Sequence, residues 1–269
     1  MTDTVRTHVT GGVATVTLNR PAKKNALTTT MYAALADALQ AAELDADVRA
    51  VVLRGDETVF CAGNDVADFL DHPQAGPEAP AYRFLRAIAR FPKPVVAAVC
   101  GPAVGIGATM LLHCDLVYAG ESATLLFPFV DLGLVPEAGS SLLLPELVGR
   151  HRAAEALLLG DPIPAAAALD AGLVNQVLPD AEVLDLAHAQ AARLAAKPVA
   201  SVIETKRLMR AGDQDAVLAR IEAEGAVFAR LLDGPEARSA LTSFLRRDRS
   251  GPAAGPTAGA ASAGRPGPR

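Results

Sequence analysis

The sequence predicts an α/β fold followed by a helical C-terminal region, and three observations carry that prediction. Short apolar or alternating runs of strand length alternate with amphipathic helical segments over the first half of the chain. From about residue 139 the pattern is largely helical, and after residue 250 only Gly, Ala, Pro, Ser, Thr and Arg occur. With 269 residues, 51% of them hydrophobic, the chain is long enough to bury one large core.

The expected strands are runs of four to six residues in which apolar side chains alternate or are continuous. They are residues 13–18, 50–53, 58–61, 95–100, 115–119, 123–127 and 173–178. The expected helices are residues 29–43, 66–70, 81–91, 199–209, 215–232 and 235–248. Thr28 and Asp65 are placed to cap the first two helices. Residues 72–80, rich in Pro, Gly and Ala, are expected to form a mobile loop.

These elements divide the chain into three parts. Residues 1–197 form the expected core, and residues 198–250 form the expected helical region. Residues 251–269 have nothing from which to build a core, so this tail is expected to be disordered.

Composition argues against two classes of partner. The net charge of −5 disfavours a nucleic-acid surface, and no apolar run reaches the roughly 18–20 residues that span a bilayer. Cys61, Cys100 and Cys114 lack the spacing of metal ligands, and such a sparse, odd count suits a reducing compartment. We therefore expect a cytoplasmic protein without a metal site and without nucleic-acid or membrane partners.

Residues 91–107 organise the chain. A strand at 95–100 is followed by Gly101-Pro102 and then by Gly105-Ile106-Gly107 at the start of another apolar segment. Small residues at a strand-to-helix turn let backbone N–H groups approach a ligand, and a helix N-terminus favours negative charge there. The stretch predicts an anion or oxyanion site built from main chain.

Six segments, in order, resemble the crotonase family, the enoyl-CoA hydratase/isomerase superfamily. They are Asn19-Arg20-Pro21 with Asn25-Ala26-Leu27, Phe60-Cys61-Ala62-Gly63-Asn64-Asp65, the run from Lys93 to Gly101, Cys114-Asp115-Leu116, Leu132-Gly133-Leu134-Val135-Pro136 and Ala171-Gly172-Leu173-Val174. Each motif alone is loose, but the ordered set is specific. The resemblance implies a spiral of β-β-α units with a C-terminal helical region that assembles trimers, often paired into hexamers.

The family stabilises the enolate of an acyl-CoA thioester with two backbone N–H groups. By resemblance these belong to Asn64, the third residue of the Ala-Gly-x-Asp motif, and to Ile106, in the middle of the glycine turn. Ile106 replaces the usual middle Gly, which leaves the main-chain donor in place if the backbone there accepts a β-branched residue. The same turn could otherwise serve only close packing.

The acidic residues decide which reaction the resemblance implies. Thr109 and Phe129 stand where hydratases of the family carry their two glutamates, so no pair is evident to activate a water. Glu137 matches the single base of the branch that isomerises 3-enoyl-CoA to 2-enoyl-CoA in fatty-acid metabolism. A pocket lined by apolar neighbours would raise its pKa. The ordinary alternative for Glu137 is a helix-start glutamate.

Coenzyme A is expected as part of the substrate, with no permanently bound cofactor. Lys23 and Lys24 lie in the loop that contacts its phosphates in relatives, although they could be a solvated surface pair. Ala62 lies where a backbone carbonyl meets the adenine. Phe244 and Arg247 fall in the C-terminal region that reaches a neighbour's site in relatives, or belong to a solvated face.

Three other readings of function stay open. They are a hydratase in which Glu137 alone activates water, another enolate reaction such as dehalogenation or thioester hydrolysis, and a non-catalytic acyl-CoA-binding trimer. Three local patterns are set aside. His113-Cys114-Asp115 does not bring a nucleophile and a base face to face, and Ser140-Ser141 lacks a nucleophile elbow. Gly105-x-Gly107 lacks the third glycine of a dinucleotide site.

Overall fold

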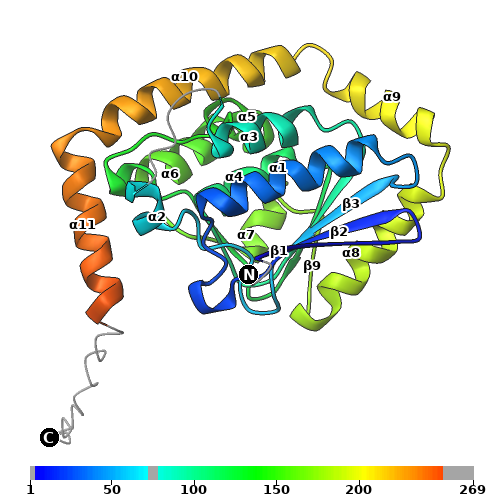
Figure 1. The fold of residues 1–269 in the computed structure, drawn as a ribbon, viewed down its shortest axis with the longest axis horizontal. Coiled ribbons are helices and arrows are strands. Elements are labelled where there is room, and N and C mark those ends of the chain that lie inside the picture. Colours follow the sequence, from blue (N-terminus) through cyan, green and yellow to red (C-terminus); the bar gives the residue numbers. More distant parts are fainter. Residues whose placement is uncertain (1–3, 72–77, 251–269) are drawn as a thin grey trace, which may run out of the picture.

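The computed structural model describes residues 4–71 and 78–250, and side chains only as far as residue 246 (Figure 1). The larger of its two sheets contains, from edge to edge, β1 (Val5–Thr10), β2 (Val13–Leu18), β3 (Ala50–Arg54), β4 (Val95–Val99), β6 (Leu116–Gly120) and β9 (Gln176–Leu178). The smaller contains β5 (Pro102–Val104), β7 (Thr124–Leu126) and β8 (Ile163–Pro164). The predicted α/β class is confirmed.

Helices follow the strands and dominate the C-terminal half. The α-helices are α1 (Thr29–Leu44), α2 (Val66–Asp71), α3 (Pro80–Arg90), α4 (Ile106–Thr109), α5 (Ser140–Val148), α6 (Arg150–Leu159), α7 (Ala165–Asp170), α8 (Asp180–Ala195), α9 (Val199–Met209), α10 (Gln214–Leu232) and α11 (Pro235–Ser250). Short 3-10 helices are η1 (Pro21–Lys23), η2 (Met110–His113) and η3 (Val130–Leu132). No helix in residues 4–71 or 78–250 is both long enough and apolar enough to cross a membrane.

The central strands of the larger sheet are buried on both faces, whereas its edge strand β1 is mostly exposed. β1 and β2 form an antiparallel hairpin, and every later neighbour pairs in parallel. All five residues of the central strand β4 are buried, which explains why this strand reads as an unbroken apolar run rather than an alternation. Helix α8 covers one face, and α1 and α3 cover the other (Figure 1).

The turn after β4 needs glycine at two positions. A Cβ on Gly101 would lie 1.9 Å from the carbonyl oxygen of Thr58, so the backbone could not approach that closely with any other residue. Gly105 ends β5 at φ 54° and ψ −119°, a conformation that side-chain-bearing residues rarely adopt. The chain then enters α4 at Ile106, which sets the direction of the N–H groups there.

The C-terminal helices fold back over the core. Helix α10 crosses the molecule and packs against α3 and α5, while α11 packs against η3 and α2 (Figure 1). The boundary expected near residue 197 therefore separates two parts of the chain that pack against each other. Residues 251–269, the expected tail, lie outside the described residues.

Helix positions agree closely with expectation. Helix α9 has the predicted bounds, and Thr28 caps α1 by accepting a hydrogen bond from the Met31 N–H at 3.3 Å. Asp65 Oδ1 accepts from the N–H groups of Ala67 and Asp68 at the start of α2. Within the expected loop at 72–80, residues 72–77 lie outside the described part, and Pro80 begins α3 because proline is favoured in a first helical turn.

One strand prediction was wrong, and another was too long. Residues 58–61 do not form a strand, because Asp56 Oδ1 accepts from the N–H groups of Thr58 and Val59 and so holds the chain in a turn. Only Cys61 pairs there, through an isolated bridge to Ala103. The strand expected at 173–178 is shortened to β9. The edge strand β1 was missed because five of its six residues are exposed, which leaves no apolar alternation to detect.

Candidate active site

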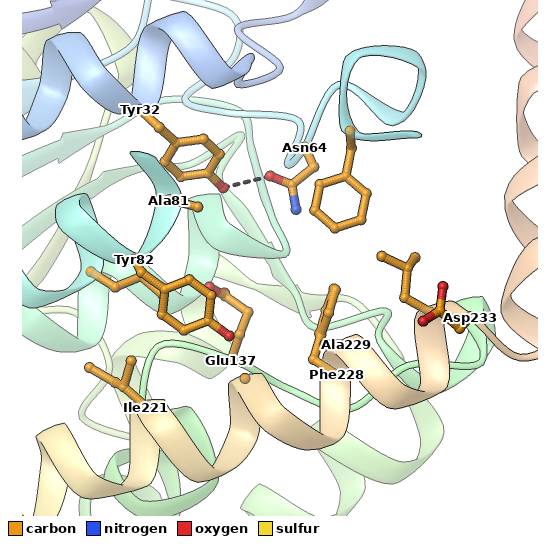
Figure 2. Close-up of a pocket in the computed structure, with 13 residues that line it drawn as sticks. Tyr32, Asn64, Ala81, Tyr82, Glu137, Ile221, Phe228, Ala229 and Asp233 are labelled. Carbon is orange, nitrogen blue, oxygen red and sulfur yellow. Dashed lines mark hydrogen bonds between the residues drawn. The ribbon is translucent and has the colours of Figure 1, made fainter. Parts of the chain in front are cut away.

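Glu137 lies in the loop between η3 and α5 and lines a cavity. The cavity is about 120 Å³ and is lined mainly by apolar and aromatic side chains from α1, α3 and α10 (Figure 2). Glu137 is half-buried, and the surface that it keeps faces this cavity. Figure 2 shows Tyr82 beside it and Ile221 and Phe228 along the wall that α10 supplies.

The environment of Glu137 disfavours its charged form. Burial is the main cause that raises the pKa of its carboxyl to about 8, and the negative charge of Glu224 contributes to that rise. Thr109 opposes this rise, because its hydroxyl donates a hydrogen bond of 2.5 Å to Glu137 Oε1. A carboxyl with a pKa near 8 is a stronger base than an ordinary glutamate and ionises close to neutral pH.

Asn64 presents an unpartnered backbone N–H. In the parallel bridge beside it, the Leu27 N–H donates to Gly63 O and the Asp65 N–H donates to Leu27 O, both at 2.8 Å. The bridge therefore uses the carbonyl of Gly63 and the N–H of Asp65, and leaves the N–H of Asn64 between them without a partner in the bridge. Among the described residues, no protein group accepts a hydrogen bond from it.

Ile106 presents a second such N–H. It is the first residue of α4, and the N–H groups of a first turn have no partner within the helix. Its backbone is helical, so the β-branched side chain fits without strain and is buried in the core, 1% exposed. Among the described residues, the Ile106 N–H also has no acceptor.

Asn64 and Ile106 share a second cavity, of about 340 Å³, which adjoins the first. Asn64, Phe69 and Phe228 line both cavities. Asn64 therefore lies on the common wall, with Glu137 on one side and Ile106 on the other. The sequence-predicted base and both predicted N–H donors lie around one continuous set of walls.

Thr109 and Phe129, which replace the two glutamates of the family's hydratases, both lie at the candidate site, and neither supplies an acid. Thr109 is fully buried and contacts Glu137, and Phe129 is buried in the wall of the second cavity. The other acidic residues among the described walls of the two cavities, Asp131 and Asp233, are both exposed. Glu137 is the one shielded carboxylate in these walls.

The residues expected to contact coenzyme A are only partly brought together. Lys24 O accepts from the Ala62 N–H at 3.0 Å, which places the exposed lysine pair beside Ala62. Ala62 and Phe244 line the second cavity, and neither Lys23 nor Lys24 does. Arg247 belongs to α11, but its side chain lies outside the described part of the structure.

Tyr32, Tyr82 and Glu224 belong to the site and were not predicted. Tyr32 is buried on α1, and its hydroxyl donates a hydrogen bond of 2.5 Å to Asn64 Oδ1 (Figure 2). Burial is the main cause that raises the pKa of Tyr32, and the Glu137 charge adds to it. In sequence both tyrosines occupy apolar helix faces, which indicates a core position and nothing more. Glu224 lies 87 positions beyond Glu137, with no local motif around it.

The fold and the site define a crotonase-type enzyme that acts on acyl-CoA. The chain belongs to the enoyl-CoA hydratase/isomerase family, whose sequence model matches residues 8–250. It is 35% identical over 235 residues to 1,2-epoxyphenylacetyl-CoA isomerase of Escherichia coli (strain K12), covering 83% of this chain and 88% of that protein. It is 36% identical over 244 residues to enoyl-CoA delta isomerase 2 of Rattus norvegicus, covering 88% of this chain but only 62% of that longer protein.

A solved structure supports the same assignment. That of Pseudomonas aeruginosa OdaA superposes with a TM-score of 0.89 and 45% sequence identity, covering 91% of this chain and 100% of that chain. Other relatives, at 34% and 32% identity, are named as hydratases. Isomerases and hydratases thus both occur among the similar proteins, and the family does not decide between the two reactions.

Proposed function

We propose that this protein isomerises 3-enoyl-CoA to 2-enoyl-CoA, with Glu137 as the single acid–base group. The observation that carries the proposal is that Glu137 is the one shielded carboxylate among the described walls of the two cavities. Asn64 and Ile106 are the proposed donors to the thioester oxygen. Their N–H groups have no acceptor among the described residues.

The reaction needs one base and one oxyanion site. Ionised Glu137 removes a proton from C2 of the thioester, and the electron pair moves into the carbonyl to form a dienolate. The N–H groups of Asn64 and Ile106 stabilise the oxygen, and a preorganised donor of this kind lowers a barrier by about 3 kcal/mol. Protonated Glu137 then delivers the same proton to C4, which moves the double bond to C2–C3 and restores the carboxylate.

Hydration of 2-enoyl-CoA is the second candidate, because hydratases occur among the relatives. A hydratase must place a water and activate it while protonating the neighbouring carbon, a task that paired acids perform. Thr109 and Phe129 supply no acid at the two positions where the family's hydratases carry one. One-base isomerisation therefore fits the side chains better.

Coenzyme A is proposed to enter as part of the substrate, with no resident cofactor. Lys23 and Lys24 would meet its phosphates and Ala62 its adenine, while Phe244 and Arg247 belong to the region that would reach a neighbouring subunit's site. The proximity of Lys24 to Ala62 and the position of Phe244 in the cavity wall support this arrangement. Assembly into a trimer or a pair of trimers is proposed from the family resemblance.

A paired assay tests the proposal. The purified protein is given 3-hexenoyl-CoA and, separately, 2-hexenoyl-CoA, and the conjugated enoyl thioester is followed by its absorbance. Gain with the first substrate and no loss with the second is the expected result. Rapid loss with the second would establish a hydratase. Silence with both, together with tight acyl-CoA binding, would indicate another enolate reaction or a binding protein.

Glu137→Gln tests the base directly. We expect it to abolish turnover while leaving acyl-CoA affinity nearly unchanged, because the amide keeps the shape and cannot accept the proton. Glu146→Gln, an exposed glutamate of α5, is the matched control and should behave as the wild type. Full activity in Glu137→Gln would refute the assignment.

A further inference from the structure

The backbone around Glu137 adopts a conformation that other groups must hold in place. Ala138 has φ 61° and Gly139 has φ 73°, so two successive residues lie in the left-handed region. Ala138 bears a Cβ and rarely adopts such a φ, and strained residues persist when their surroundings over-determine them. The direction of the Glu137 side chain depends on this segment keeping its shape.

His113 forms a hydrogen bond with this segment. Its Nε2 lies 2.7 Å from the carbonyl oxygen of Ala138, and the ring is buried. Burial lowers the pKa of His113 to about 4, with Arg210 and Lys206 adding to the effect, so the ring is neutral at pH 7. The carbonyl can only accept, which assigns the single ring proton to Nε2.

Glu224, on α10, accepts two hydrogen bonds from the same segment. Its Oε2 accepts from the Gly139 N–H at 2.6 Å, and its Oε1 accepts from the Ser141 N–H at 2.9 Å. The side chain is buried, 6% exposed. Gly139 is the N-cap of α5 and has no side chain to satisfy these donors, so a carboxylate from a distant helix does so.

Polar and titratable groups from several helices surround the two glutamates. Glu137 faces Thr109 of α4, Tyr32 of α1, Tyr82 of α3 and Glu224 of α10, with Cys61 nearby. Glu224 faces Tyr82 and, on its own helix, Arg220, which attracts its charge and donates to the Ser141 hydroxyl at 3.1 Å. Among these groups, Glu224 is the only other carboxylate.

We propose that Glu224 is a positioning residue for the base: together with His113 it holds residues 138–141 in place by hydrogen bonds, and its charge repels the ionised form of Glu137. The inference rests on the proposed role of Glu137. It gives α10, which also lines the first cavity with Ile221 and Phe228, a direct connection to the proposed base. Glu224 itself touches no substrate, because it is absent from the walls of both cavities.

Glu224→Gln tests the proposal, with Glu222→Gln as control. Glu222 is exposed on the same helix, so its variant removes the same charge without removing a contact to the loop. The Glu224 amide keeps one acceptor and loses one of the two bonds. We expect kcat with 3-hexenoyl-CoA to fall about tenfold or more through misplacement of the base, with KM little changed. The control should match the wild type.

A second readout does not depend on which reaction the enzyme performs. In protein carrying 13C-labelled glutamate carboxyls, the Glu137 signal is assigned by its loss in Glu137→Gln and is then titrated. We expect its midpoint to move to lower pH in Glu224→Gln, because a neighbouring negative charge has been removed. The shift in the Glu137 midpoint is expected even if the protein is not an isomerase. Failure of the proposed function can therefore be told apart from failure of the proposed role of Glu224.

Either of two results would overturn the inference. One is a Glu224→Gln protein with the kcat of the control, and the other is a Glu224→Gln protein in which the titration midpoint of the Glu137 carboxyl has not moved. If Glu224→Gln does not fold, Glu224→Asp replaces it, because the charge stays while the reach is shortened. Lowered kcat at unchanged KM is then expected, and wild-type kcat would overturn the inference.

Discussion

The Thr109 hydroxyl lies 2.5 Å from Glu137 Oε1 and is the only hydrogen-bond donor to that carboxylate among the described residues. The contact joins α4, which begins at the candidate oxyanion N–H of Ile106, to the loop that carries the candidate base. The position that bears an acid in the family's hydratases thus supports the Glu137 carboxylate instead.

Removing this hydroxyl should move the pH dependence of catalysis upward. Thr109→Val keeps the buried volume but removes a bond to the charged form, so the pKa of Glu137 rises above about 8. Turnover needs the carboxylate, so the rising limb of kcat/KM moves to higher pH. A bond to a charged group is worth about 1.5–3 kcal/mol, which predicts a loss of between about tenfold and a hundredfold at pH 7.

The control for this variant is Thr205→Val, an exposed threonine of α9 whose pH profile should match the wild type. The measurement is kcat/KM for 3-hexenoyl-CoA between about pH 6 and pH 10. An unmoved limb in Thr109→Val would show that the hydroxyl does not stabilise the ionised base.

Truncation of Ile106 should cost stability and spare activity. The proposed donor is its backbone N–H, which Ile106→Ala retains, whereas the buried side chain loses its packing. We expect the free energy of unfolding to fall by about 2–5 kcal/mol and kcat to change little. Chemical denaturation and a turnover assay below the unfolding transition check both parts. A large loss of kcat in folded protein would mean that the side chain, and not only the main chain, serves the reaction.

Gly225 makes room for Tyr82 in the first cavity, which Glu137 also lines. A Cβ at this position of α10 would lie 1.7 Å from the Tyr82 hydroxyl oxygen, so Gly225→Ala forces the ring to move. Alanine otherwise favours a helix over glycine by about 1 kcal/mol, and the clash must outweigh that gain. We expect kcat/KM for 3-hexenoyl-CoA to fall together with the melting temperature.

The double variant Gly225→Ala with Tyr82→Ala separates the clash from other effects. Once the ring is absent, the helical gain of alanine remains, and Gly225→Ala should then raise the melting temperature relative to Tyr82→Ala alone. If Gly225→Ala destabilises both backgrounds equally, the contact with Tyr82 is not the cause.

A partly buried ion pair holds α9 against the larger sheet, with the Lys206 side chain 8% exposed and that of Asp115 24% exposed. Lys206 Nζ lies 2.7 Å from Asp115 Oδ2 and donates to Lys93 O at the same distance, and Asp115 also accepts from the Val95 N–H. Lys206→Met would leave the carboxylate with a weaker partner in Arg210, 3.1 Å away. Breaking a fully buried pair costs about 3–5 kcal/mol, and solvent still reaches Asp115, so we expect the free energy of unfolding to fall by an amount at or below the lower end of that range.

Arg207→Met is the matched control for the ion pair. Arg207 is the next residue of α9, and its side chain is 59% exposed, so its contact with Glu204 is a surface pair. Such pairs contribute about 0–1 kcal/mol, and denaturation should show little change. Equal losses in the two variants would contradict the structural role of Lys206.

The sequence by itself determined the order of the elements and the candidate reacting groups. Periodicity predicted α1 and α10 because amphipathic helices bury one face, and the family motifs pointed to Asn64, Ile106 and Glu137. Such features are local, since a cap, a glycine turn or an apolar run depends on residues a few positions apart. The prediction failed at residues 58–61, where the Asp56 side chain competes with strand pairing, and at β1, whose side chains are mostly exposed.

Only the tertiary structure decided how the base is held. Glu224, Tyr32 and His113 come from separate helices and meet the site through packing, so no spacing along the chain announces them. The pKa of Glu137 is likewise a property of the folded molecule, because burial, the hydrogen bond from Thr109 and the charge of Glu224 on α10 together set it. A motif can name a carboxylate, but its basicity and direction depend on groups that folding brings within a few ångströms.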